Sequence, residues 1–284
     1  VIWKYDDGDV VTSNWTGRAV KEPRAAIRKG YNFTGWADEN GKEYIWYGKT
    51  EIWYGQAPVL FPVIGQLIDD KYRYNGKEYS MPKHGLARKL LFSVKECAGA
   101  KAVFSLESSE ETLRSYPFDF ELLVTFELNG KSLKNTMTVI NKTKGEMYFS
   151  IGAHPGFNCA VGDIIEFEQP ETLATERIDS DNLIIDKKFP LLENSREIEI
   201  TEDIFKADAL ILSGIKSEKL RIKGENELEF TFGKCPFLGI WAKPGAPYVC
   251  LEPWYGVNDG REVKNDISEK RGIEKLNEGE TFEF

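Results

Sequence analysis

The chain has 284 residues, a formal net charge of −9 at pH 7, 41% hydrophobic and 29% charged residues. This balance excludes a disordered chain, and no apolar run approaches the ~20 residues that a membrane-spanning helix needs. The negative charge argues against nucleic acid or an anionic membrane as partner, because both need a positive field. We expect a globular protein with one large domain, or a main domain with a small appendage.

Residues 1–40 differ in sequence pattern from the rest of the chain: they contain strand and turn signals and a proline. They resemble an internalin-type B-repeat, a small surface module. The residues that carry this resemblance are Gly30, Tyr31, Phe33, Gly35 and Trp36. The alternative is that this segment forms the first hairpins of the main domain. We therefore predict a boundary between residues 1–40 and 41–284.

Strand signals dominate the remaining chain. Asn75–Gly76 and Asn129–Gly130 are strong hairpin turns. Apolar residues before the second turn alternate with period two from Phe118 to Leu128, and the return strand places Leu133, Met137 and Val139 on one face. Leu228, Phe230 and Phe232 alternate in the same way. Many short strands with polar turns predict an all-β fold, a large antiparallel β-sandwich.

Helix signals are sparse. Short candidates occur around 109–116 and 201–210. The chain lacks the glycine-rich phosphate-binding motifs of nucleotide-binding folds, and no run of alternating strands and helices is visible. The four cysteines, Cys97, Cys159, Cys235 and Cys250, are too widely spaced for a paired metal or redox motif. We interpret them as reduced and mostly buried thiols.

Two histidines and two carboxylates stand at the ends of apolar runs. They are His84 in "MPKHGLAR", His154 in "SIGAHPGFN", Asp208 in "DIFKADALIL" and Glu252 in "CLEPWYG". Histidine can give or take a proton near neutrality, and a carboxylate with a tuned pKa can be its partner. The set is compatible with acid–base chemistry on a neutral molecule. From these residues alone, structural roles in the core are the favoured interpretation.

Five segments in order resemble the aldose 1-epimerase (galactose mutarotase-like) family, and particularly its bacterial LacX-type branch. The resemblance covers the chain from about Gly41 to its C-terminus. The segments are "APVLFPVIG" at 57–65, "MPKHGLAR" at 81–88, "FSIGAHPGFN" at 149–158, "DIFKADALIL" at 203–212 and "CLEPWYGVND" at 250–259.

The resemblance implies a β-supersandwich that binds a sugar and interconverts its α and β anomers. Glu252 would be the general base that removes the anomeric hydroxyl proton, and His154 the general acid that protonates the ring oxygen. His84 would hydrogen-bond near that oxygen, and Asp208 would bind sugar hydroxyls. The family's chemistry needs no metal and no organic cofactor, so neither is expected.

Departures from the family pattern concern substrate contacts. The galactose mutarotases have an arginine where this chain has Gln66. Arg88 matches a phosphate-binding position of the hexose-6-phosphate mutarotases, but the second arginine of that branch is missing and Lys83 replaces its usual glutamine. We slightly favour an unphosphorylated aldose over a sugar phosphate, and expect Arg88 to contact substrate or to close its loop. Trp254 could form an apolar floor for the sugar, or pack in the core.

Other functions remain as alternatives. Residues 1–40 and the missing arginine would also suit a non-catalytic carbohydrate-binding or surface-interaction module. Glycoside hydrolysis is weaker, because it normally needs two carboxylates around the bond. The main domain predicts a cytoplasmic location, whereas a genuine B-repeat would predict secretion. The sequence leaves the particular aldose and the oligomeric state open.

Overall fold

The computed structural model describes residues 2–5, 10–12, 33–37, 42–262 and 265–284. The chain forms two compact units. The first comprises residues 1–43, 89–148 and 275–284, and the second residues 44–88 and 149–274. In the part that is described, no helix is long and apolar enough to cross a membrane.

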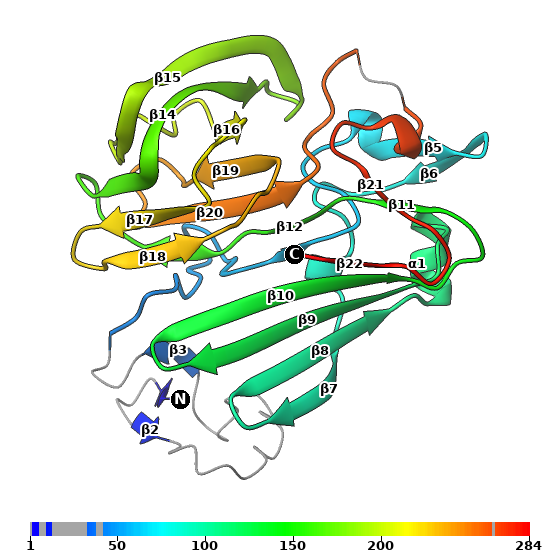
Figure 1. Cartoon of the computed structure of the whole chain (residues 1–284), viewed down its shortest axis with the longest axis horizontal. Coiled ribbons are helices and arrows are strands. Elements are labelled where there is room, and N and C mark those ends of the chain that lie inside the picture. The colour runs from blue at the N-terminus through cyan, green and yellow to red at the C-terminus, as the bar shows by residue number, and fades with distance from the viewer. Residues whose placement is uncertain (1, 6–9, 13–32, 38–41, 263–264) are drawn as a thin grey trace. The chain divides into compact units, whose positions relative to one another are not determined.

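The first unit is built on a five-stranded antiparallel sheet with the strand order β22-β10-β9-β8-β7 (Figure 1). Its strands are β7 (Ser93–Ala98), β8 (Lys101–Glu107), β9 (Phe120–Asn129), β10 (Ser132–Asn141) and β22 (Thr281–Glu283). The short helix α1 (Glu110–Ser115) begins with a capping box in which Ser109 and Thr112 satisfy each other's backbone N–H groups. The predicted helix at 109–116 is confirmed.

The predicted β9–β10 hairpin is confirmed, with Asn129 paired to Ser132. Gly130 in the turn has φ 58°, a left-handed conformation that favours glycine. Side chains alternate between the two faces of the hairpin. Leu122 and Val139, on its apolar face, are buried, whereas the residues near the turn are exposed. The predicted apolar face is therefore a core face over only part of its length.

Part of the segment 1–40 is described as a small antiparallel sheet. It contains β1 (Ile2–Tyr5), β2 (Val10–Thr12) and β3 (Phe33–Ala37), in the order β2-β1-β3. Gly30 and Tyr31 of the B-repeat-like motif lie outside the described residues, as does the predicted boundary at residues 40 and 41. The B-repeat stays a prediction.

A separate two-stranded sheet joins β11 (Met147–Phe149) and β21 (Glu274–Leu276).

The second unit contains a ten-stranded sheet with the order β18-β17-β14-β16-β19-β20-β12-β4, in which β13 also pairs with β20 and β15 with β14 (Figure 1). Its strands are β4 (Val59–Leu60), β12 (Ile151–Ala153), β13 (Gly156–Asn158), β14 (Ile164–Ile178), β15 (Ile184–Glu199), β16 (Leu210–Ser213), β17 (Lys219–Lys223), β18 (Leu228–Thr231), β19 (Phe237–Trp241) and β20 (Tyr248–Tyr255). All its strand pairs are antiparallel, which confirms the predicted all-β class. The central strand β20 is almost entirely buried.

Shorter elements complete this unit. They are the hairpin β5 (Lys71–Tyr74) and β6 (Lys77–Ser80), and the 3-10 turns η1 (Ile68–Asp70), η2 (Ala87–Lys89) and η3 (Ile267–Glu269). The predicted turn between β5 and β6 is confirmed, because Asn75 and Gly76 both have positive φ, at 50° and 74°.

The helix predicted at 201–210 is wrong. Residues 201–209 form bends and turns that lead into β16. Arg177 explains the difference, because its Nη1 donates to the carbonyl oxygens of Asp208 at 2.7 Å and Ala209 at 3.2 Å. Asp208 itself has φ 62°, which a right-handed helix cannot contain. A long-range side chain thus holds the segment in an irregular form.

Candidate active site

Glu252 lies on the central strand β20, with a side chain that is only 2% exposed. Side chains alternate along a strand, so Cys250, Glu252 and Trp254 share one face of the sheet. The residue opposite Glu252 on β19 is Gly239, which has no side chain to cover the carboxylate. The Trp254 indole packs against Gly239 instead, so the strand presents a buried acid in apolar surroundings.

His154 follows β12 directly and precedes Pro155, where the chain turns into β13. Its Nε2 lies 3.2 Å from Glu252 Oε2. The imidazole stacks on the indole of Trp53, with ring centroids 5.1 Å apart, and meets Trp241 edge-on at 5.8 Å. The two indoles hold the ring against the carboxylate, and only 11% of the His154 side chain is exposed.

His84 is fixed by its own backbone and by Gly65. Its backbone N–H donates to the Gly65 carbonyl at 2.9 Å, and the Gly65 N–H donates to His84 Nδ1 at 3.1 Å. Because Nδ1 accepts a hydrogen bond, the neutral ring carries its proton on Nε2. The ring is 5.8 Å from that of His154 and nearly perpendicular to it. The structure therefore brings His84, His154 and Glu252 together.

Burial controls the protonation of this cluster. Burial lowers the pKa of His154 to about 3; a backbone hydrogen bond opposes this shift, and the positive charges of Arg88 and Lys83 contribute to it. Burial likewise holds the pKa of His84 well below its usual range. It raises the pKa of Glu252 well above its usual range, where Lys83 opposes and Asp208 reinforces the shift. The neutral pair of imidazole and carboxylic acid is thus favoured in the sugar-free protein.

Two buried atoms of the pair lack hydrogen bonds. His154 Nδ1 has no partner, and Glu252 Oε2 accepts no hydrogen bond of normal geometry despite its contact with His154. An unsatisfied buried polar group usually costs about 1 to 3 kcal/mol. Orphan atoms of this kind mark a site where a ligand can supply the missing partners.

Two cations lie beside the pair. Lys83 Nζ donates to Asn182 Oδ1 at 2.6 Å, and burial lowers its pKa while Asp208 and Glu252 raise it. The buried Nε of Arg88 has no hydrogen-bond partner. Both side chains therefore add positive charge near the imidazoles, and Arg88 retains a donor for a ligand.

Asp208 is exposed and sits at the entry to β16, next to β19 in the sheet. Its Oδ1 accepts from the Ala209 N–H at 2.7 Å. The Arg177 contacts described above hold the backbone carbonyl groups of Asp208 and Ala209. Because the Asp208 charge affects the pKa of both Lys83 and Glu252, the carboxylate belongs to the same cluster.

Trp254 occupies the core beside Glu252, at 3% exposure. A Cβ at Gly152 or Gly239 would lie within 2.7 Å of its indole, so both neighbouring strands leave room for this ring. The indoles that contact His154 are those of Trp53 and Trp241, both half-buried. Trp53 and Trp241 lie outside the five segments that resemble the family.

Other residues of the site were not singled out by sequence reasoning. Cys250 lies two residues before Glu252 in a strand, a spacing that signals a shared face, but the cysteines were interpreted only as buried thiols. All four are free; Cys159 and Cys250 are buried and Cys97 and Cys235 half-buried. Asn182 and Arg177 carried no local signal, because their contacts join segments far apart in the chain.

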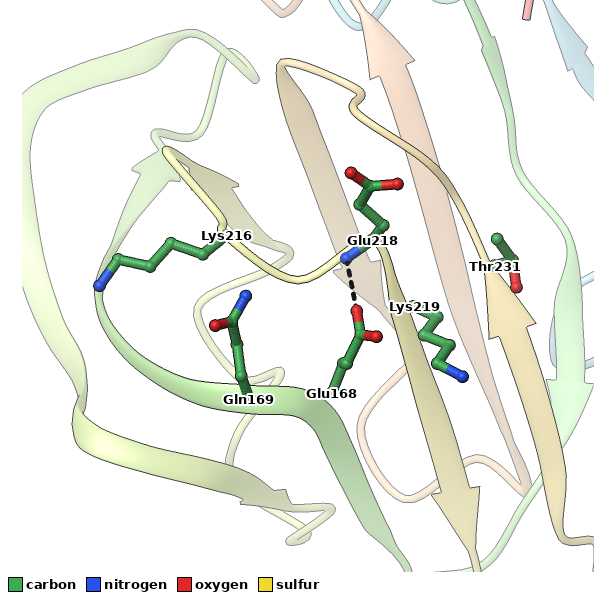
Figure 2. A pocket seen from close by; sticks show the side chains of 6 residues that line it. All are labelled: Glu168, Gln169, Lys216, Glu218, Lys219 and Thr231. Atoms are coloured by element: carbon green, nitrogen blue, oxygen red, sulfur yellow. Dashed lines mark hydrogen bonds between the residues drawn. The ribbon is translucent and has the colours of Figure 1, made fainter.

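A separate surface pocket of about 480 Å³ lies over β14, β17 and β18 (Figure 2). In it the Glu218 N–H donates to Glu168 Oε2 at 3.3 Å. The lining residues are Glu168, Gln169, Lys216, Glu218, Lys219 and Thr231. None of the candidate catalytic residues lines this pocket, and it holds no histidine.

The antiparallel sheet brings a glutamate and two histidines together in one buried cluster. Comparison with known proteins identifies the family. The sequence model of the family "Aldose 1-epimerase" matches residues 27–253. The chain therefore belongs to the aldose 1-epimerase family and is an enzyme of the isomerase class.

Individual relatives support the same conclusion. Protein LacX (plasmid) of Lactococcus lactis subsp. lactis is 32% identical over 269 residues, which cover 87% of this chain and 89% of LacX. A solved structure of a galactose mutarotase related enzyme from Lactobacillus acidophilus has a TM-score of 0.83 at 30% identity and covers 89% of both chains. The predicted galactose mutarotase-like β-sandwich is confirmed. A putative glucose-6-phosphate 1-epimerase of Escherichia coli K12 is 28% identical over 146 residues, 48% of this chain and 44% of that protein.

Proposed function

We propose that this protein is an aldose 1-epimerase that interconverts the α and β anomers of an aldose. The observation that carries the proposal is the contact of His154 Nε2 with Glu252 Oε2 at 3.2 Å, in a buried cluster with His84. An acid and a base held together in a water-poor site can act on both oxygens of one hemiacetal.

Glu252 is the general base that accepts the proton of the anomeric hydroxyl, and His154 is the general acid that gives a proton to the ring oxygen. The C1–O5 bond breaks as the C1 carbonyl forms, which gives the open-chain aldehyde. Rotation about C1–C2 and reclosure through the reverse transfers gives the other anomer. No net proton is gained or lost, so the pair is ready for the next turnover.

The protonation states fit this cycle. The reactive state needs a carboxylate at Glu252 and an imidazolium at His154, which together hold one proton. The favoured sugar-free pair, a carboxylic acid and a neutral imidazole, also holds one proton. One transfer across the 3.2 Å contact interconverts the two states.

The remaining residues bind and orient the sugar. His84 Nε2–H donates a hydrogen bond near the ring oxygen, because Nδ1 is already engaged with Gly65. Asp208 accepts from sugar hydroxyls, and the free Nε of Arg88 donates to the substrate. Trp254 packs in the core beside Glu252 and so supports the carboxylate rather than the sugar. A small-molecule sugar is the partner, and a cytoplasmic location stays a prediction.

One observation favours a second substrate class. Lys83 and Arg88 place two cations at the site, and the E. coli relative named for glucose 6-phosphate matches about half of this chain. A sugar phosphate could be held by both cations. The presence of Asp208 beside Lys83 opposes an anion, so we keep the free aldose as the first proposal.

The test is anomer equilibration followed by NMR or polarimetry with freshly dissolved α-D-glucose, α-D-galactose and glucose 6-phosphate. We expect acceleration over buffer for a free aldose. Faster equilibration of the phosphate than of either free sugar would establish the second substrate class. No acceleration over buffer with any of a panel of aldoses would contradict the proposed function.

A further inference from the structure

Cys250 brings a thiol to the proposed acid–base pair. One ligand atom from each of His154, Cys250 and Glu252 lies within 4.8 Å of the other two. Cys250 and Glu252 share a face of β20, and the residues paired with them include Gly156 on β13 and Gly239 on β19. Neither glycine has a side chain, and the indoles of Trp53 and Trp254 pack against these two positions, beside the three donors.

The distances suit a tetrahedral metal ion. Bond lengths of about 2.0 to 2.1 Å to nitrogen and oxygen give roughly 3.3 Å between these atoms in tetrahedral zinc. The observed distance between His154 Nε2 and Glu252 Oε2 is 3.2 Å. With a Zn–S bond of about 2.3 Å, the sulfur of Cys250 should lie roughly 3.5 Å from both atoms in the loaded site. In the present structure the three donor atoms lie within 4.8 Å of one another.

A second observation points to a ligand at this place. Glu252 is 1% exposed, yet its Oε2 accepts no hydrogen bond of normal geometry. A buried carboxylate oxygen of this kind is costly unless it is paired or coordinates a metal. The cluster therefore has both the donor set and an unsatisfied ligand atom directed into it.

We propose that His154, Cys250 and Glu252 form a site for a borderline-soft divalent cation, best filled by Zn²⁺, whose occupancy inhibits the enzyme. Thiolate and imidazole donors favour Zn²⁺ over Mg²⁺ or Ca²⁺, which prefer oxygen. On binding, the Cys250 thiol and the Glu252 carboxylic acid each release a proton to solvent. One Zn–S, one Zn–N and one Zn–O bond form, and water or a sugar hydroxyl takes the fourth position.

The inhibition rests on the proposed function. A zinc ion bonded to Glu252 and His154 removes the general base and the general acid together. The positive charges of Lys83 and Arg88 beside the pair oppose a cation. Binding is thus reversible and chelator-sensitive, which suits an inhibitory site better than a resident cofactor.

The site can be tested in the absence of sugar. Titration with Cd²⁺, a zinc analogue, should produce an ultraviolet thiolate-to-metal charge-transfer band, and calorimetry should give one Zn²⁺ per chain. The matched variants are Cys250→Ser and Cys97→Ser, the second altering a half-buried thiol of the other unit. We expect Cys250→Ser to lose the band and to weaken Zn²⁺ binding by roughly tenfold or more, whereas Cys97→Ser keeps both.

An unchanged band in Cys250→Ser, or no binding to the original chain, would overturn the site. If Cys250→Ser fails to fold, Glu252→Gln keeps the thiol and should still weaken Zn²⁺ binding by roughly tenfold. Unweakened Zn²⁺ binding in that variant would equally overturn the donor set.

Inhibition is measured separately, as Zn²⁺-dependent loss of anomer equilibration that is restored by EDTA. Metal binding without such loss in an active enzyme would overturn the inhibitory role. A chain that binds Cd²⁺ through Cys250 but equilibrates no aldose would contradict the proposed function and leave the metal site standing.

Discussion

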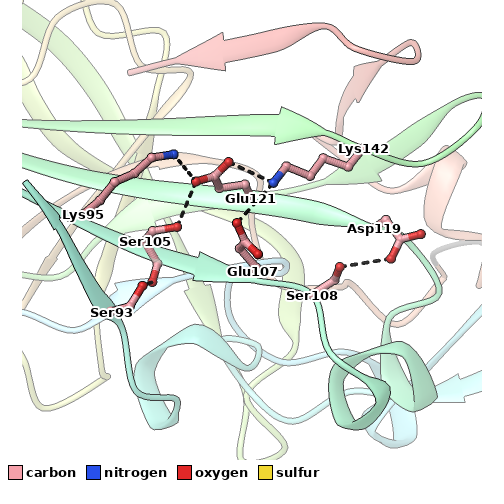
Figure 3. A network of polar contacts seen from close by, with 8 residues as sticks. All are labelled: Ser93, Lys95, Ser105, Glu107, Ser108, Asp119, Glu121 and Lys142. Carbon is pink, nitrogen blue, oxygen red and sulfur yellow. Dashed lines mark hydrogen bonds and ion pairs between the residues drawn. The ribbon is translucent and has the colours of Figure 1, made fainter.

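Glu121 in the five-stranded sheet and Glu252 in the ten-stranded sheet are both buried, at 5% and 1% exposure, but their surroundings differ. Glu121 is held by Lys95, by Lys142 at 3.0 Å and by the Ser105 hydroxyl at 3.0 Å (Figure 3). The hydrogen bond from Lys95, with help from Lys142 and Ser105, lowers the pKa of Glu121 to about 2 against the effect of burial.

Glu252 contacts the neutral imidazole of His154. Burial raises the pKa of Glu252, because the opposing effects of Lys83 and Trp254 are smaller. The pKa values of two buried glutamates thus shift in opposite directions, because their partners differ. Glu121 has hydrogen-bond and ion-pair partners, so its network stabilises the fold. Glu252 has an oxygen without a hydrogen bond, which costs stability and leaves an acid available for chemistry.

The largest expected effect is on catalysis by Glu252→Gln. The amide cannot take a proton, so we expect anomer equilibration to fall by about 10²- to 10⁴-fold. The variant should unfold at the original temperature or above it, because the substitution removes a buried acid. Activity assays and thermal unfolding on the same sample measure both. A variant that equilibrates sugar at the original rate would remove Glu252 from the mechanism.

His84→Asn should have a smaller effect. Asparagine tolerates the left-handed backbone at this position, where φ is 63°, and its side-chain oxygen can accept from the Gly65 N–H. The donor directed to the sugar is lost, so we expect a decrease of roughly 10- to 100-fold in kcat/KM. Steady-state kinetics measure it, and an unchanged kcat/KM would show that His84 has no contact with the transition state.

Glu121→Gln should produce the reverse pattern. The amide loses charge-assisted hydrogen bonds from Lys95 and Lys142, and since both lysines are half-exposed we expect a loss of only about 1 to 2 kcal/mol in the free energy of unfolding. Anomer equilibration should not change. Urea unfolding and the activity assay together check this. A loss of activity without a loss of stability would contradict the assignment of Glu121 as structural.

The smallest expected effect is the pH dependence that Glu121 gives to the free energy of unfolding. Because folding lowers the pKa of Glu121 to about 2, its contribution is fully present above its unfolded pKa of about 4.5 and is lost as the pH falls towards 2. We therefore expect the stability difference between the original chain and Glu121→Gln to shrink between about pH 5 and about pH 3. Urea unfolding at the two pH values measures it, and a constant difference would show that the carboxylate gains nothing from its lysines.

Much of this architecture was predictable from local sequence. Asn75–Gly76 and Asn129–Gly130 identify their hairpins because the turn conformation depends on few residues. His84, His154 and Glu252 were found through the order of the family motifs, and their convergence follows from the pairing of distant strands. The roles assigned to them stay predictions until the variants are measured.

Other features were not accessible from sequence. The irregular backbone at 201–209, where a helix was predicted, depends on Arg177, which is distant in the sequence. The core position of Trp254 depends on the absence of side chains at Gly152 and Gly239 of neighbouring strands. The proximity of Cys250 to His154 likewise needs the sheet register. Each depends on which strands are neighbours, information that period-two patterns do not contain.

Exchange between the anomeric proton signals of an aldose, followed by NMR with equal amounts of the original chain, Glu252→Gln and Glu121→Gln, tests the central claim most directly. We predict fast exchange with the original chain and with Glu121→Gln, and exchange that is slower by about 10²- to 10⁴-fold with Glu252→Gln. Retained exchange with Glu252→Gln while that variant remains folded would contradict the account.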